Sequence, residues 1–156
     1  MRNRAVGIVL YKQQILLMFR RSKGREYFVI PGGGIESTES PTEAVVREIF
    51  EETSVQAADP RLLYEIVWDN GDTHWFFLLT YIQGVPALHP QSPEMQKMRA
   101  ATSYYEPMWV PLEKLADLRV YPLEIRDLLI QDVPGQINER CACPRRIAVK
   151  LADRRE

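Results

Sequence analysis

The sequence predicts an α/β domain built on one mixed β-sheet. Apolar segments of strand length alternate with single helical segments along the chain, as expected when helices cover the faces of a sheet. With 156 residues, the chain has the size of one ordinary domain and can bury a core without a disulfide or a structural metal. We expect this domain over residues 1–133 and a C-terminal tail over residues 134–156.

The chain begins with two apolar runs that predict a β-hairpin. Residues 4–11 and 14–20 each have strand length, and the two residues between them suit a tight turn. A third run, residues 27–30, stops at a proline. Three glycines follow at positions 32–34, where the backbone can adopt positive φ and approach a ligand closely.

A helix is predicted to start at Ser40-Pro41. Serine is a preferred N-cap, proline is tolerated in the first helical turn, and the acidic Glu43 suits the same turn. Apolar residues then recur three and four positions apart as far as Thr53, where we expect the helix to end.

Two longer strands are predicted in the middle of the chain. Residues 62–68 and 73–82 are rich in aromatic and aliphatic side chains, and Asn70-Gly71 between them is a strong hairpin signal. Residues 84–104 contain three prolines and predict a long loop with one helical turn near residues 94–100.

Beyond this loop the pattern predicts a short strand and two helices. The strand covers residues 108–110, and the helices cover residues 112–118 and 123–132, the second opened by Pro122. The pattern fades after the second helix, although residues 147–151 alternate in a way that suits one added strand in the tail.

The charge balance argues against two broad classes of partner. The 20 basic and 21 acidic residues give a net charge of −1, which makes no electrostatic case for bulk nucleic-acid or membrane binding. The apolar runs are far shorter than the ~20 residues that span a membrane, and Cys141 and Cys143 are too close for an unstrained disulfide. We therefore expect a cytoplasmic protein, which could form a homodimer through its aromatic strands or its tail.

Three glutamates gather on one face of the predicted helix. Glu48, Glu51 and Glu52 are three and four positions apart, so their carboxylates repel near a helix C-terminus that already disfavours negative charge. A solvated acidic surface is one interpretation. The glycines before the helix, with Glu39 and Arg47 at fixed offsets, favour a second one, in which the carboxylates bind Mg²⁺ or Mn²⁺ through hard oxygen ligands.

The segment from Gly33 to Val55 resembles the Nudix box, Gly-x5-Glu-x7-Arg-Glu-U-x-Glu-Glu-x-Gly-U, where U is a bulky aliphatic residue. Glu39 and the run Arg47-Glu48-Ile49-Phe50-Glu51-Glu52 fall at the positions that the pattern requires. The resemblance to MutT-like Nudix hydrolases implies their fold, an α/β/α sandwich with a central mixed sheet. Ser54 stands where the family has glycine, so we expect a slightly different helix end.

The resemblance also implies an activity and a site. Family members hydrolyse a nucleoside diphosphate linked to another group, with Mg²⁺ or Mn²⁺, by attack of water on phosphorus. By position, the implied metal ligands are Glu48, Glu51, Glu52 and the carbonyl of Gly32. Arg47 would orient a carboxylate, Glu39 would be its partner or a further ligand, and Glu51 or Glu48 would be the general base. Glu106 is an alternative base, although its offset fits poorly.

Substrate contacts must come partly from outside the box. Arg20 and Arg25, in a basic segment before the glycines, could meet phosphates together with the backbone at Gly33 and Gly34, or could simply be solvated. Several aromatic residues could stack on a base or pack in the core: Trp68, Trp75, Phe77, Tyr104 and Tyr105. His74 and His89 show no partner spacing and are interpreted as non-catalytic.

Two other functions remain open at the level of sequence. One is a non-catalytic module that binds a nucleotide or a metal on the same fold, although a mere sensor would have no need to keep every carboxylate of the box. The other is an RNA 5′-end pyrophosphohydrolase, which shares the chemistry. Such an enzyme is expected to have a basic groove for RNA, and the near-neutral charge of this chain gives no sign of one. The leading hypothesis is a diphosphohydrolase with a small-molecule nucleotide substrate.

Overall fold

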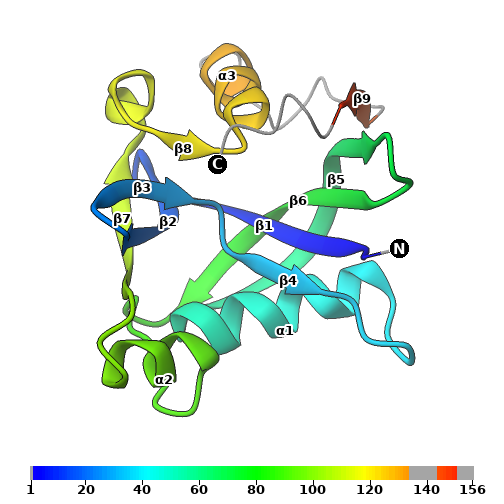
Figure 1. Cartoon of the computed structure of the whole chain (residues 1–156). Coiled ribbons are helices and arrows are strands. Elements are labelled where there is room, and N and C mark those ends of the chain that lie inside the picture. The colour runs from blue at the N-terminus through cyan, green and yellow to red at the C-terminus, as the bar shows by residue number, and fades with distance from the viewer. Residues whose placement is uncertain (1, 134–143, 151–156) are drawn as a thin grey trace.

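The computed structural model describes residues 2–133 and 144–150, and these residues form one curled sheet with helices on both of its faces (Figure 1). The strands are β1 (Arg4–Tyr11), β2 (Gln14–Ser22), β3 (Arg25–Val29), β4 (Gly32–Gly34), β5 (Gln56–Trp68), β6 (Thr73–Gln83), β7 (Tyr104–Pro111), β8 (Val120–Tyr121) and β9 (Arg145–Val149). The helices are α1 (Pro41–Thr53), α2 (Pro93–Arg99), the 3-10 helix η1 (Leu112–Asp117) and α3 (Leu123–Asp132).

The sheet is mixed, as the sequence predicts. Its main path runs β8-β3-β2-β1-β6-β5-β9, while β4 pairs with β1 and β7 pairs with β2. The pairs β1–β6, β3–β8 and β5–β9 are parallel, and the remaining pairs are antiparallel. The fold is therefore the predicted α/β sandwich with a central mixed sheet.

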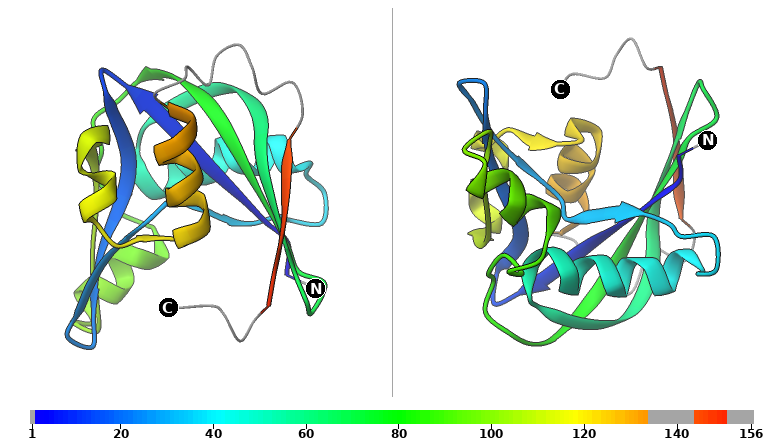
Figure 2. Two further views of the ribbon diagram at one scale, coloured as in Figure 1. Left: turned by 90° about the horizontal axis from the view of Figure 1, so that it is seen from above. Right: turned by 60° about the horizontal axis from the view of Figure 1, so that its bottom comes forward.

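Two separate cores form because β1 sends alternate side chains to opposite faces of the sheet. Ala5 and Val9 pack with the apolar face of α1, whereas Val6 and Ile8 belong to the larger core that includes α3. In Figure 2 these two helices lie on opposite sides of the central strands. A strand that is buried on both faces has a continuous apolar sequence, which is the pattern of residues 5–11.

Two of the strands are longer than the sequence predicts. β5 begins at Gln56 rather than at residue 62, and β7 spans Tyr104–Pro111 rather than residues 108–110. β7 pairs with β2 over its whole length, from Gln14↔Pro111 to Arg21↔Tyr104, so hydrogen bonding continues past the apolar centre of the strand. The very short strands β4 and β8 were not predicted, because pairing rather than hydrophobic pattern defines them.

The end of the chain contributes one described strand. β9 pairs in parallel with β5 at the edge of the sheet, and Arg146 forms a 2.9 Å ion pair with Glu65 of that strand. Cys141, Cys143 and the remainder of residues 134–143 lie outside the described residues, so the division into a domain and a tail remains a prediction. Within residues 2–133 and 144–150, no helix is long and apolar enough to cross a membrane.

Candidate metal centre and adjoining cavity

The glycine segment lies directly against helix α1. β4 pairs with β1, with Ala5 opposite Gly33, and a Cβ added at Gly33 would overlap the carboxylate of Glu48. A Cβ at Gly32, whose φ is 155°, would overlap the backbone of β1. Glycine is thus required at position 32, where the neighbouring atoms are backbone, whereas a Cβ at position 33 would displace the end of the Glu48 side chain.

Both ends of α1 are fixed by side chains. Ser40 and Glu43 form a reciprocal capping box at its start. At its end, Ser54 adopts the left-handed conformation, with φ 62° and ψ 7°, and its N–H donates to the Phe50 carbonyl at 2.9 Å. The sequence led us to expect an altered helix end, but serine keeps the conformation that glycine would take. Its hydroxyl also donates to the Ala87 carbonyl at 2.9 Å.

Arg47 holds together three of the predicted site carboxylates. Its Nε donates to Glu39 at 3.0 Å, and its Nη1 donates to Glu48 at 2.9 Å and to Glu51 at 3.0 Å. Its Nη2 donates to the carbonyl of Gly34 at 3.1 Å. The hydrogen bonds from Arg47 lower the pKa of Glu39 to about 2, and the same contacts raise the pKa of Arg47 itself.

Glu52 lies on the inner side of this group. One of its carboxylate oxygens accepts a hydrogen bond from the Gly32 N–H at 3.0 Å. Burial raises the pKa of Glu52 to about 8, and the negative charge of nearby Glu94 adds to the effect. Burial also raises the pKa of Glu48, despite its contact with Arg47. Two carboxyls are therefore held where ionisation is unfavourable without additional positive charge.

The donor set fits a divalent cation of the Mg²⁺ type. Glu48, Glu51, Glu52 and the Gly32 carbonyl offer only hard oxygen atoms, and a cation would offset the cost of ionising the two buried carboxyls. In the described part of the chain no group of three acidic or His side chains is already arranged as a metal site. Arg47 accounts for part of this, because it binds Glu48 and Glu51.

A cavity of about 270 Å³, here called the metal-side cavity, is lined by the box glutamates Glu48, Glu51 and Glu52. Its opposite wall is the segment His89–Glu94, so Glu94 at the first turn of α2 faces the same space. Glu94 was not among the site residues predicted from the sequence. Its signal was Ser92-Pro93, the same helix start as Ser40-Pro41, with Ser92 accepting from the Met95 N–H at 3.1 Å.

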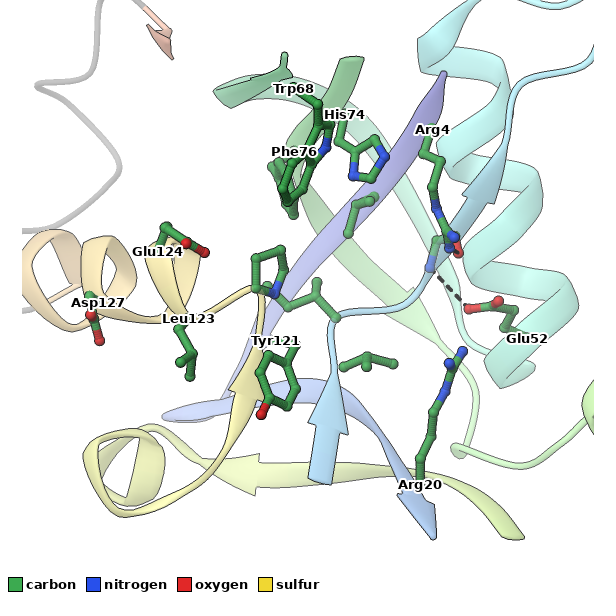
Figure 3. A pocket seen from close by; sticks show the side chains of 15 residues that line it. Arg4, Arg20, Glu52, Trp68, His74, Phe76, Tyr121, Leu123, Glu124 and Asp127 are labelled. Atoms are coloured by element: carbon green, nitrogen blue, oxygen red, sulfur yellow. Dashed lines mark hydrogen bonds between the residues drawn. The ribbon is translucent and has the colours of Figure 1, made fainter. Parts of the chain in front are cut away.

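A second cavity of about 400 Å³, here called the main cavity, opens on the other side of Glu52 (Figure 3). Arg4 and Arg20 line it beside Glu52 and Gly32, and Arg4 donates to the Gly32 carbonyl at 2.8 Å. The Nε of Arg20 is buried and makes no hydrogen bond within the described residues. Arg4 was not a sequence candidate; it belongs to the site because β1 lies beside β4.

Aromatic rings form the middle of the main cavity, and α3 closes its far end. Trp68 and Phe76 project from β5 and β6, Tyr121 comes from β8, and Glu124 and Asp127 come from the first turns of α3 (Figure 3). The cavity thus joins a cationic end to an acidic end through an aromatic passage.

The predicted substrate residues are distributed unevenly. Arg20 lines the main cavity, whereas Arg25 is exposed at the start of β3 and lines neither cavity. Gly33 and Gly34 touch the box through Glu48 and Arg47 respectively.

Other candidates also fall in different places. Glu106 is exposed on β7, where the Tyr104 hydroxyl donates to it at 3.0 Å, and it lines neither cavity. Of the aromatic candidates only Trp68 lines the main cavity, since Trp75 and Phe77 pack on the α1 side of the sheet. His74 lines the main cavity and His89 the metal-side cavity.

Comparisons with known proteins show the family and the fold. Residues 1–129 match the family model described as the NUDIX domain. Over 121 residues, 64% of this chain and 69% of the relative, the chain is 29% identical to an RNA pyrophosphohydrolase of Shigella boydii. A relative of that name from Pectobacterium atrosepticum is 41% identical over 58 residues, which are 37% of this chain and 33% of that protein. A MutT structure described for Aliivibrio salmonicida and Vibrio cholerae superposes with TM-score 0.66 at 23% identity, covering 86% of this chain and 98% of that one.

Proposed function

The chain belongs to the Nudix family and is a diphosphohydrolase of that family, and from this premise we propose that it uses Mg²⁺ or Mn²⁺ to cleave a diphosphate bond in a nucleotide derivative. The observation that carries the proposal is that Glu48, Glu51 and Glu52 line one cavity, and that Glu52, which accepts from the Gly32 N–H, also lines the main cavity. Substrate phosphates entering past Arg4 and Arg20 would meet the cation there.

Glu48, Glu51, Glu52 and the Gly32 carbonyl would hold the cation, which when bound supplies positive charge to the phosphate oxygens and acidifies water. Arg47 positions Glu48 and Glu51 through its two Nη1 hydrogen bonds, and Glu39 holds Arg47 in place. Arg4 and Arg20 bind phosphate oxygens as charged donors.

In the reaction, a water oxygen attacks phosphorus in line with the bridging oxygen, and the bond from phosphorus to that bridging oxygen breaks. A carboxylate takes the water proton, and the departing phosphate or nucleotide leaves as an anion. Glu51 and Glu48 are the candidate bases on α1. Glu94 faces both of them across the metal-side cavity and is a further candidate.

A panel of nucleotide substrates with Mg²⁺ tests the proposal, with released phosphate and pyrophosphate as the readout. Glu51→Gln and Glu52→Gln should each lose more than about tenfold in rate while remaining folded. Glu113→Gln, the same change on the exposed surface of η1, is the matched control and should retain the wild-type rate. Wild-type rates in both site variants would refute the site. No turnover with nucleotide binding retained would indicate a non-catalytic module.

RNA with a 5′-triphosphate is the second candidate substrate. Relatives named RNA pyrophosphohydrolase match the chain, and Arg21 on β2 lies 5.6 Å from the exposed Tyr104 ring and 5.8 Å from the Phe19 ring. Rings and guanidinium groups of this kind can stack on unpaired bases. Pyrophosphate release from triphosphorylated RNA at a higher kcat/KM than from free nucleotides would favour this candidate.

Two wider predictions belong to the same proposal. A cytoplasmic location is consistent with a nucleotide substrate. A homodimer is proposed only from the exposed apolar side chains, such as Ile82 and Val85 at the end of β6 and beyond it, and sedimentation would test it.

A further inference from the structure

Arg4 contacts a backbone group that belongs to the proposed metal centre. Its Nη2 donates to the Gly32 carbonyl at 2.8 Å, and that carbonyl is one of the proposed ligands of the divalent cation. Arg4 is not part of the Nudix box; it reaches the carbonyl because β1 pairs with β4. The contact therefore places a positive charge of the chain itself on the oxygen that a cation would use.

The alternation of side chains along β1 fixes the side from which Arg4 approaches. Arg4 is two residues before Val6, whose side chain belongs to the core on the α3 side of the sheet, so Arg4 reaches Gly32 from the main cavity. Glu52 comes from α1 and accepts from the Gly32 N–H at 3.0 Å. Both polar groups of the Gly32 backbone are thus bound, the N–H by a box carboxylate and the carbonyl by a guanidinium.

The Arg4 guanidinium is half-buried beside the box carboxylates. Burial is the main effect that lowers the pKa of Arg4, and the negative charge of Glu52 is the main effect that opposes it. Figure 3 shows the side chains of Arg4 and Arg20 pointing toward Glu52 from opposite sides. Arg4 thus supplies, from within the chain, part of the positive charge that favours ionised box carboxyls.

A cation and the Arg4 guanidinium are incompatible occupants of the Gly32 carbonyl. The oxygen has a second lone pair, but both positive charges would then share one atom in a half-buried site, where they repel more strongly than in bulk water. A guanidinium that leaves the carbonyl for the main cavity escapes this repulsion. Its donors then become free for phosphate oxygens.

We propose that Arg4 competes with the divalent cation for the Gly32 carbonyl, and that the Arg4 guanidinium leaves the carbonyl for the substrate phosphates in the main cavity when the cation binds. Arg4 is then a positioning residue that couples the binding of the cation to the binding of the substrate. The proposal rests on the proposed function for the place of the cation. Binding equilibria test it without turnover.

Binding of Mn²⁺ alone, followed by the paramagnetic signal of the free ion, tests the competition. Arg4→Met keeps the aliphatic stem and removes the charge and the donors, so it should bind Mn²⁺ about tenfold more tightly than wild-type protein. If Arg4 instead held the carbonyl in place for the cation, Arg4→Met would bind Mn²⁺ more weakly, which would overturn the inference. A purely structural Arg4 would lower the melting temperature and leave the Mn²⁺ affinity unchanged, and that result would also overturn it.

Arg20→Met is the matched control for charge. Arg20 lines the same cavity, and its Nε makes no hydrogen bond within the described residues. The variant removes a positive charge near Glu52 without freeing the Gly32 carbonyl, so the Mn²⁺ affinity should change much less than in Arg4→Met. Equal tightening in both variants would show a general effect of charge and would overturn the competition for the carbonyl.

Inorganic phosphate tests the release of the guanidinium. Saturating Mn²⁺ should increase the affinity of wild-type protein for phosphate, through the cation itself and through the freed Arg4. In Arg4→Met only the cation contributes, so the increase should be about tenfold smaller. An equal increase in the two proteins would overturn the proposed coupling.

The proposed function can fail separately. Tighter Mn²⁺ binding in Arg4→Met, combined with no hydrolysis of any diphosphate substrate, would defeat the proposed function and leave the competition standing. Hydrolysis by a wild-type protein whose Mn²⁺ affinity Arg4→Met leaves unchanged would do the reverse. No Mn²⁺ binding to either protein would overturn the competition, whatever the activity.

Discussion

The two cavities that meet at Glu52 are built in different ways. The carboxylates of the metal-side cavity come mainly from one turn of α1, and only Glu94 arrives from elsewhere. The main cavity takes its residues from β1, β2, β3, β4, β5, β6, β8, α1 and α3. One wall is encoded by spacing within a single helix, and the other is encoded by the topology of the whole sheet. The candidate metal ligands can therefore be identified from the sequence, whereas the residues that line the main cavity cannot.

The largest effect should follow from disturbing the locally encoded wall. Arg47→Lys keeps the positive charge and loses the fork that binds Glu39, Glu48 and Glu51 together. We expect kcat to fall about 10–100-fold and the Mg²⁺ concentration for half-maximal rate to rise, as when a residue that orients metal ligands is replaced. Arg61→Lys on the exposed face of β5 is the control. A variant with unchanged Mg²⁺ dependence would show that Arg47 does not position the ligands.

Adding one methyl group at Gly32 should show how closely the glycine strand is packed against β1. A Cβ there would overlap the backbone of Ala5 and Val6, so we expect Gly32→Ala to lose about 1–3 kcal/mol in the free energy of unfolding. Gly34→Ala is a close control, because a Cβ there meets no heavy atom within 4 Å, and its effect should stay within about 0.5 kcal/mol. Equal effects in denaturant titrations would contradict this packing.

A change in the assembled wall should affect binding more than chemistry. Arg20→Met keeps the aliphatic stem and removes the buried Nε donor, so we expect KM to rise about tenfold while kcat changes less than about twofold. Arg25→Met, outside both cavities, should leave KM unchanged. Steady-state kinetics distinguishes these outcomes, and a fall confined to kcat would assign Arg20 to the chemical step instead.

The smallest expected effect is a pH dependence of stability where the two cavities meet. Burial raises the pKa of Glu52 from 4.5 to about 8, so between these values the metal-free folded chain binds a proton that the unfolded chain does not. The contribution of protonated Glu52 to the free energy of unfolding is fully present below about pH 4.5 and is lost as the pH rises through 8. We expect a loss of about 1 kcal/mol after relaxation and hydration, or about 2–4 °C in the melting temperature. Glu52→Gln should flatten the profile, and an equally steep profile in that variant would exclude Glu52 as its source.

Local signals predicted much of the fold. The helix at Ser40-Pro41, the turn at Lys12-Gln13 and the boundaries of α3 all depend on neighbouring residues, and the structure confirms them. The strands β4 and β8 could not be predicted, because two or three residues have no period and become strands only by pairing with β1 and β3. Arg4, Glu94 and Glu124 were missed for the same reason: the fold, not their sequence neighbours, brings them to the site.

Ser54 connects the end of α1 to the long loop that follows β6. Its hydroxyl bonds to the Ala87 carbonyl, and the Ala87 N–H bonds in turn to the Thr53 carbonyl. Glycine at this position would relieve the backbone but would lose the first of these bonds. The serine thus joins the loop to the end of α1 through one more hydrogen bond than glycine would allow. A displacement of the loop that leads to Glu94 would therefore also displace Ser54, two residues after Glu52. Glu52 and Glu94, which line the metal-side cavity from opposite sides, are thus coupled in position although they are far apart in the sequence.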